Sequence, residues 1–197
     1  MRYLLLAAAL LTLPTSLAHA GEPTQHLKER VDEIVRMVDA SGKSRPGQHR
    51  GDVRRIAETI FDYPETARRA LGPHWTQRTP AEQKEFVGVF ADLLDRAYLS
   101  KVDQYQGEKI RYTNETMEGD QATVKTMIVM PRGSEVPVDY RMHQVNGRWL
   151  VYDVIIEGVS LVSNYRQQFN KIIQTESYPA LIAKMRSKQA EPAASGR

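Results

Sequence analysis

The sequence predicts an α+β fold with N-terminal helices, a four-stranded curved antiparallel sheet, and C-terminal helices packed on that sheet. Apolar residues recur every three or four positions over residues 24–102, which is the spacing of amphipathic helices. Over residues 110–156 the chain is rich in β-branched side chains and much of it alternates apolar with polar residues, as half-buried strands do. Helical spacing returns after Gly158. Helices, then strands, then helices is an order typical of an α+β domain.

The first 20 residues have the features of a signal peptide. Arg2 is followed by an apolar run over residues 4–17 and by small residues up to Ala20. We expect cleavage after Ala20, one domain over residues 21–187 and a disordered tail over residues 188–197. The 197-residue chain contains no cysteine, which excludes disulfides, thiolate nucleophiles and cysteine-ligated metals. We therefore expect an exported protein without a lipid anchor.

Three helices are expected before the longest one. The first begins near Thr24, and a polar segment over residues 41–47 separates it from a second, whose apolar stripe lies within residues 53–61. Pro64 suits the first turn of a short third helix, and Gly72 ends it.

The strongest helix signal begins at Thr79. Pro80 fits the first helical position, and Glu82, three residues after Thr79, completes a capping box. A long apolar stripe follows from Phe86 to Val102. The pattern predicts one long helix with a single apolar face.

Four sequential strands follow Gly107, joined by short links that favour an antiparallel meander. They are expected over residues 110–117, 122–130, 136–142 and 149–156. Gly119 lies in the first turn, and Asn146-Gly147 is a tight hairpin signal. The fourth strand is apolar on both faces except at Asp153, so we expect a packed element over each face.

Two helices are expected after the sheet. The first has an apolar face over residues 161–173, and the second carries Leu181, Ile182 and Met185. Gly158-Val159-Ser160-Leu161-Val162 is superficially similar to a nucleophile elbow, but the elbow needs a small residue where Val162 stands. Ser160 is therefore expected to cap the helix.

The chain lacks most motifs for chemistry or cofactors. None of its five histidines has a partner at a metal-ligand spacing, and no glycine-rich phosphate loop or dinucleotide fingerprint occurs. We therefore expect no metal and no cofactor. The net charge is +3, but the basic residues are dispersed, so we expect no nucleic-acid partner. Asp153 is the remaining catalytic candidate; the competing interpretation is an ion pair with Arg141 or a bond to a backbone donor at the sheet rim.

One block of the C-terminal half carries a specific resemblance. Residues 149–169 contain Trp149, Tyr152-Asp153, Glu157-Gly158-Val159-Ser160, Tyr165-Arg166 and Phe169. This set closely resembles the signature of the MlaC family, the toluene-tolerance or Tgt-type auxiliary component of an ABC lipid transporter. The resemblance extends upstream through Val138-Asp139-Tyr140-Arg141 to the helix at Thr79-Pro80, and covers about residues 25–187.

The resemblance implies a periplasmic lipid carrier and not an enzyme. It implies an apolar cavity between the curved sheet and its helices that holds the acyl chains of a diacyl phospholipid. The carrier would shuttle the lipid between an outer-membrane lipoprotein complex and an inner-membrane ABC transporter complex with its substrate-binding subunit, and so maintain outer-membrane lipid asymmetry. A related branch is associated with hopanoid pathways, so a hopanoid is an alternative cargo.

The expected tail contacts share an apolar or aromatic character and come from three parts of the chain. They are Phe86, Phe90, Leu94 and Tyr98 on the long helix; Val138, Tyr140, Tyr152, Val154 and Ile156 on the strands; and Val159, Val162, Tyr165 and Phe169 in the turn and helix that follow. Arg141 and Arg166 are the expected contacts to a headgroup or to an acidic partner. For each single position, ordinary core packing is the competing interpretation.

Two further interpretations stay open. An enzyme built on a similar cone-shaped α+β fold would use Asp153 in an acid–base pair. An adaptor without a ligand would bridge membrane complexes and have a filled core.

Overall fold

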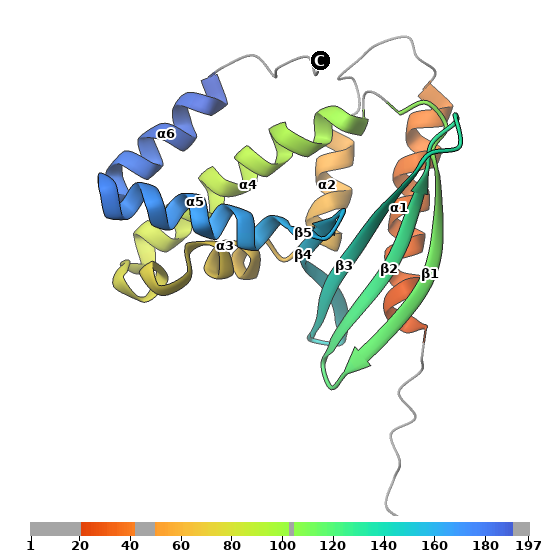
Figure 1. The fold of residues 1–197 in the computed structure, drawn as a ribbon, viewed down its shortest axis with the longest axis horizontal. Coiled ribbons are helices and arrows are strands. Elements are labelled where there is room, and N and C mark those ends of the chain that lie inside the picture. Colours follow the sequence, from red (N-terminus) through yellow and green to blue (C-terminus); the bar gives the residue numbers. More distant parts are fainter. Residues whose placement is uncertain (1–20, 42–49, 103–104, 191–197) are drawn as a thin grey trace, which may run out of the picture.

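The computed structural model describes residues 21–41, 50–102 and 105–190 (Figure 1). The predicted signal peptide and residues 191–197 of the predicted tail lie outside this range. The last helix continues to Ala190, three residues into the segment expected to be a disordered tail.

The helices and strands follow the predicted order. The helices are α1 (Glu22–Ser41), α2 (Arg50–Ile60), α3 (Tyr63–Leu71), the 3₁₀ helix η2 (Gly72–Gln77), α4 (Pro80–Val102), α5 (Leu161–Thr175) and α6 (Tyr178–Ala190). The strands are β1 (Lys109–Glu118), β2 (Gln121–Val129), β3 (Glu135–Val145), β4 (Arg148–Ile156) and β5 (Val159–Ser160). The predicted α+β architecture is confirmed.

The sheet has five strands rather than the four predicted. Its order is β1-β2-β3-β4-β5, and every neighbouring pair is antiparallel. The additional strand, β5, is two residues long and pairs Val159 with Ile156 after a turn in which Glu157 and Gly158 have φ of 50° and 82°. A two-residue strand is too short to produce an alternating pattern, so periodicity did not detect it.

An irregularity in β4 changes which of its residues share a face of the sheet. The β3–β4 register shifts between Arg141 and Met142, so that Met142 pairs with Val151 while Tyr140 pairs with Val154. Met142 and Tyr140 are two residues apart and share a face of the sheet, so Val151 and Val154 share that face although they are three apart. Leu150 and Ile155, which pair with His143 and Asp139, lie on the opposite face, so both faces of β4 keep apolar residues.

The helices form two groups around the sheet (Figure 1). Helix α1 lies along the long strands, and its Leu27 is buried in one core with Ile60 of α2, Val124, Trp149 and other sheet residues. Helices α3 to α6 form a second group beside β4 and β5. The core of this group is centred on aromatic rings from α4 and α5.

The N-caps of α4 and α5 are formed by the residues predicted to form them. The Glu82 carboxylate accepts hydrogen bonds from the Thr79 backbone N–H and hydroxyl, and the Glu82 N–H donates back to the Thr79 hydroxyl. The Ser160 hydroxyl oxygen accepts from the Ser163 N–H at 3.0 Å and caps α5. Within the described ranges, no helix has the length and apolarity needed to cross a bilayer.

Candidate functional site

A cavity of about 370 Å³ lies between the sheet and the helices α2, α4 and α5. Its walls are largely apolar and aromatic. Ten of the thirteen residues predicted as tail contacts line it, namely Phe90, Leu94, Tyr98, Val138, Tyr140, Tyr152, Val154, Ile156, Val162 and Tyr165. The volume falls within the roughly 300–1,000 Å³ range of small-molecule sites. The long helix, the sheet and α5 thus contribute to one cavity, as the family resemblance implied.

Three predicted residues do not line this cavity. Phe86 and Phe169 are buried in the core of the helical group, with ring centroids 5.7 Å apart in an edge-to-face arrangement. Val159, next to the β4–β5 turn, is 57% exposed. The ten that do line it remain predictions as lipid contacts.

Tyrosine rings make up a large part of the wall. Tyr63, Tyr98, Tyr140, Tyr152 and Tyr165 all line the cavity. Burial raises the pKa of Tyr140 to about 12, and burial is also the main cause of a pKa of about 12 for Tyr165. Both phenols are therefore neutral at physiological pH and present uncharged rings to the cavity.

Several wall residues were not predicted, and one of them is a carboxylate. Asp95 on α4 accepts a hydrogen bond from the Tyr63 hydroxyl at 2.9 Å and lies 3.1 Å from Nε of Arg54. The pKa of Asp95 is raised above its ordinary value, mainly because the carboxyl group is partly buried. In sequence Asp95 lies between Leu94 and the charged Arg96, so no local pattern distinguishes it from other charged residues of this helix. The other missed wall residues are Ala57, Phe61, Tyr63, Thr66, Ile128 and Leu161.

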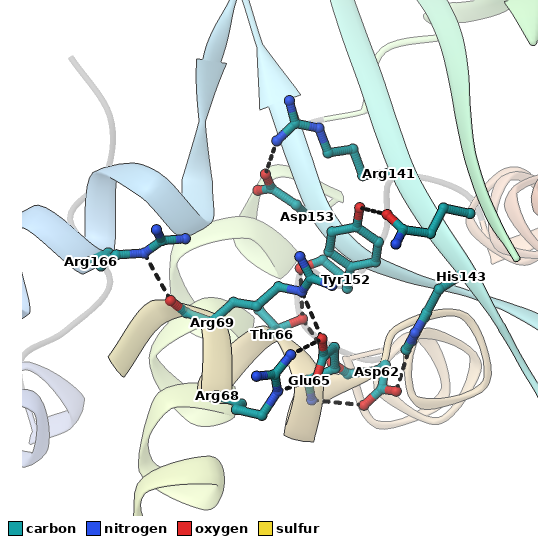
Figure 2. A network of polar contacts seen from close by, with 11 residues as sticks. Asp62, Glu65, Thr66, Arg68, Arg69, Arg141, His143, Tyr152, Asp153 and Arg166 are labelled. Atoms are coloured by element: carbon teal, nitrogen blue, oxygen red, sulfur yellow. Dashed lines mark hydrogen bonds and ion pairs between the residues drawn. The ribbon is translucent and has the colours of Figure 1, made fainter. Parts of the chain in front are cut away.

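Asp153, the candidate acid–base residue, also borders the cavity but its oxygens are already engaged. It is 4% exposed and accepts hydrogen bonds from the Ser160 hydroxyl at 2.7 Å and the Val162 N–H at 3.1 Å. Arg141 Nη1 is 3.4 Å from its Oδ2 (Figure 2). The contacts to Arg141 and to a backbone N–H are those expected if Asp153 is not catalytic.

The two predicted arginines lie in one polar cluster beside the cavity wall (Figure 2). Arg141 extends from β3 to Asp153, and Arg166 on α5 donates from Nε to the Arg69 carbonyl at 2.9 Å. The Arg69 guanidinium lies 4.0 Å from the centre of the Tyr152 ring, a cavity residue. Both predicted arginine residues are exposed.

Candidate metal ligands do not gather in the described part of the chain, where no three histidine, aspartate or glutamate side chains form a group. The site is therefore a largely apolar cavity with an arginine-containing polar cluster beside one wall. Such a site suits a ligand with a large apolar part.

The sequence matches the MlaC protein family over residues 25–187. It is 21% identical over 192 residues to the intermembrane phospholipid transport system binding protein MlaC of Haemophilus influenzae, covering 93% of this chain and 89% of that protein. It is 23% identical over 134 residues to the toluene tolerance protein ttg2D of Pseudomonas putida, covering 67% and 62% of the two chains.

A solved structure has the same fold. It is the phospholipid-binding protein from Ralstonia solanacearum in complex with a phospholipid, with a TM-score of 0.75 and 24% identity. The similarity covers 86% of this chain and 97% of that one. The family match spans most of the chain, and the fold comparison agrees with it. The chain therefore belongs to the MlaC family.

Proposed function

We propose that this protein is a periplasmic carrier that binds phospholipid acyl chains in the cavity between its sheet and helices. The observation that carries the proposal is the cavity itself, which is lined mainly by apolar and aromatic side chains in a chain of the MlaC family. The Haemophilus influenzae relative is named for phospholipid transport, and the Ralstonia protein with this fold is in complex with a phospholipid.

The free energy of exposing acyl chains to water explains why such a carrier needs an apolar cavity but no catalytic group. Moving a diacyl lipid through water exposes about 30 methylene groups at roughly 0.8 kcal/mol each, or on the order of 25 kcal/mol. Rings such as Tyr140 and Tyr165, neutral at physiological pH, can replace water around the chains and themselves carry no charge that the chains would desolvate. The carrier proposal therefore needs a shielded apolar surface and no catalytic group.

The same reasoning argues against the enzyme interpretation based on Asp153. A general acid or base needs an oxygen free to reach the substrate. The contacts of Asp153 to Ser160, Val162 and Arg141 hold the end of the sheet to the start of α5. We propose that Asp153 has a structural role and that the protein is not an enzyme.

The first experiment is mass spectrometry of organic extracts from the processed protein, exported by its own leader and purified without detergent. We expect about one phospholipid per protein, with an unrelated exported protein purified in the same way as the control. A hopanoid in the extract would keep the carrier and change its cargo. A stably folded protein free of lipid would overturn the proposal.

We further propose that the carrier shuttles between an outer-membrane lipoprotein complex and an inner-membrane ABC transporter complex, and that Arg141 and Arg166 meet a headgroup or an acidic partner. Both side chains are exposed beside the cavity wall. A photo-crosslinking residue at each position, activated in intact cells, should give adducts with membrane proteins or with lipid. Recovery of unmodified protein alone from both positions would contradict this assignment.

A further inference from the structure

The carboxylate of Glu115 joins the N-terminal end of α1 to strand β1 of the sheet. Glu115 on β1 accepts a hydrogen bond from the backbone nitrogen of Gly21 at 2.7 Å. Its other oxygen accepts from the Thr24 N–H at 2.8 Å and from the Thr24 hydroxyl at 2.5 Å. The contact joins segments more than 90 residues apart in sequence, and the carboxylate is partly buried.

Gly21 is also the residue that would follow the predicted cleavage site at Ala20. Hydrolysis there adds water across the Ala20–Gly21 amide and breaks its C–N bond. The carboxylate stays on Ala20, and the amine left on Gly21 takes up a proton at neutral pH. Processing by a signal peptidase therefore converts the nitrogen that already lies 2.7 Å from Glu115 into an ammonium.

We propose that removal of the leader creates an ion pair between the Gly21 α-ammonium and the Glu115 carboxylate, which holds α1 on the sheet in the processed protein. The two observations are independent, because the leader motif identifies the bond that is cut and the fold places Glu115 beside it. The amide N–H of Gly21 donates to a carboxylate in the unprocessed chain, and the ammonium adds to this hydrogen bond the attraction between two opposite charges.

Electrostatics at this helix end requires such a partner. The positive end of the α1 dipole disfavours an ammonium at its first residue, and the Glu115 carboxylate offsets this cost. The charged groups near His26 in this part of α1 include Glu22, Glu29 and Arg30 on the same helix and Arg148 on β4. Of these, Glu22 is already in contact with the Trp149 indole, whose Nε1 lies 3.4 Å from Oε2.

The position of the ion pair gives it a structural consequence. Helix α1 buries Leu27 to 1% exposure against a core that includes Val124 and Trp149 of the sheet. Fixing the first turn of α1 restrains the end of this helix nearest Trp149. The domain should therefore be more stable after processing than while its leader is attached.

The test is a cycle of four proteins in urea unfolding at a pH of about 6.5. The chain begins either at Gly21 or with residues 18–20 retained, each with Glu115 or with Glu115→Gln. With Glu115 present, we expect the chain that begins at Gly21 to have an unfolding constant about fivefold lower than that of the extended chain. In the Glu115→Gln background this advantage should be lost, because nothing then offsets the unfavourable interaction of the ammonium with the helix dipole, and the chain that begins at Gly21 should be no more stable than the extended chain. An equal effect of the extension in both backgrounds would overturn the proposal.

Two further measurements keep the test decisive if Glu115→Gln does not fold. N-terminal sequencing of the exported protein should begin at Gly21, and another start would overturn the proposal.

NMR titration should find the α-amino pKa of the processed protein above its ordinary value of about 7.7–8.0. The stabilisation is then present below that value and is lost as pH rises through the raised pKa. Glu118→Gln on the same strand, an exposed position, is the matched control.

Discussion

The carboxylate of Asp153 accepts the hydroxyl hydrogen of Ser160 at 2.7 Å, and Ser160 in turn caps the first turn of α5. Strand β4, the short strand β5 and α5 are therefore connected through one buried side chain. Because Tyr152, Val154 and Val162 flank this connection and line the cavity, the same contact fixes part of the cavity wall.

Asp153→Asn should lower the stability of the protein without removing its ligand. The amide replaces one acceptor oxygen with a donor, so either the Ser160 hydroxyl or the Val162 N–H loses its partner. We expect the free energy of unfolding to fall by about 1–3 kcal/mol in urea titrations. The amount of lipid per folded protein should not change. Unchanged stability together with loss of a chemical activity would instead favour the enzyme interpretation.

Val154→Trp should reduce lipid loading while the protein stays folded. Val154 faces the cavity, so an indole can occupy space that the ligand would use. The matched control is Val151→Trp on the same strand, because Val151 is fully buried and packed in the core under α1 and α2. We expect that control to unfold or to lose several kcal/mol, since overpacking a filled core strains it. Mass spectrometry of extracts and circular dichroism distinguish the two results. Unfolding of both variants would favour the adaptor with a filled core.

Glu65→Gln should remove part of the destabilisation caused by acid. Hydrogen bonds from Arg68, and from Arg69 at 2.7 Å, hold the pKa of Glu65 below its ordinary value of about 4.5. A lowered pKa means that the ionised side chain stabilises the fold above the ordinary value, and that this is lost as pH falls through the folded-state pKa. Unfolding free energies between about pH 3 and pH 6 should therefore depend less on pH in the variant. Glu118→Gln, at an exposed position, should leave the dependence unchanged.

Gly72→Ala should destabilise the junction between α3 and η2. Gly72 has φ 57° and ψ −129°, and an added Cβ would lie 3.3 Å from Cδ of Arg166. We expect a loss of about 1–3 kcal/mol in the free energy of unfolding. Gly88→Ala is the control, because Gly88 lies within α4 with no atom near its added Cβ, and it should gain about 1 kcal/mol or less. Equal effects in thermal or urea unfolding would contradict the assigned strain at Gly72.

Much of the fold follows from local signals in the sequence. The capping box at Thr79 and Glu82 starts α4 because it satisfies helix N–H groups with side chains three residues apart. Asn146 and Gly147 form a turn with φ of 50° and 77°, which these residue types adopt readily. The spacing of Phe90 and Leu94 on one helix face placed both on the cavity side.

Other parts of the site depend on contacts that local patterns do not contain. Phe86 and Phe90 lie on the same face of α4 and stack at 5.7 Å, yet only Phe90 borders the cavity. Phe61 and Tyr63 reach the cavity because the segment between α2 and α3 pairs with β4, where the Asp62 N–H donates to the Val151 carbonyl at 2.9 Å. Their sequence context shows an apolar stripe and a helix start, and neither feature indicates a site.

The sequence by itself determined the order of helices and strands, the helix caps, the hairpin turn and which stripes of side chains are apolar, and the family resemblance indicated ten of the residues that line the cavity. The tertiary structure decided which of those side chains meet a close-packed neighbour and which face open space. The register shift that brings Val151 and Val154 to one face, and the carboxylate of Asp95 in the wall, belong to the second group. The physical reason is that periodicity reports which face of an element is apolar, whereas a cavity depends on the distance between elements far apart in the chain.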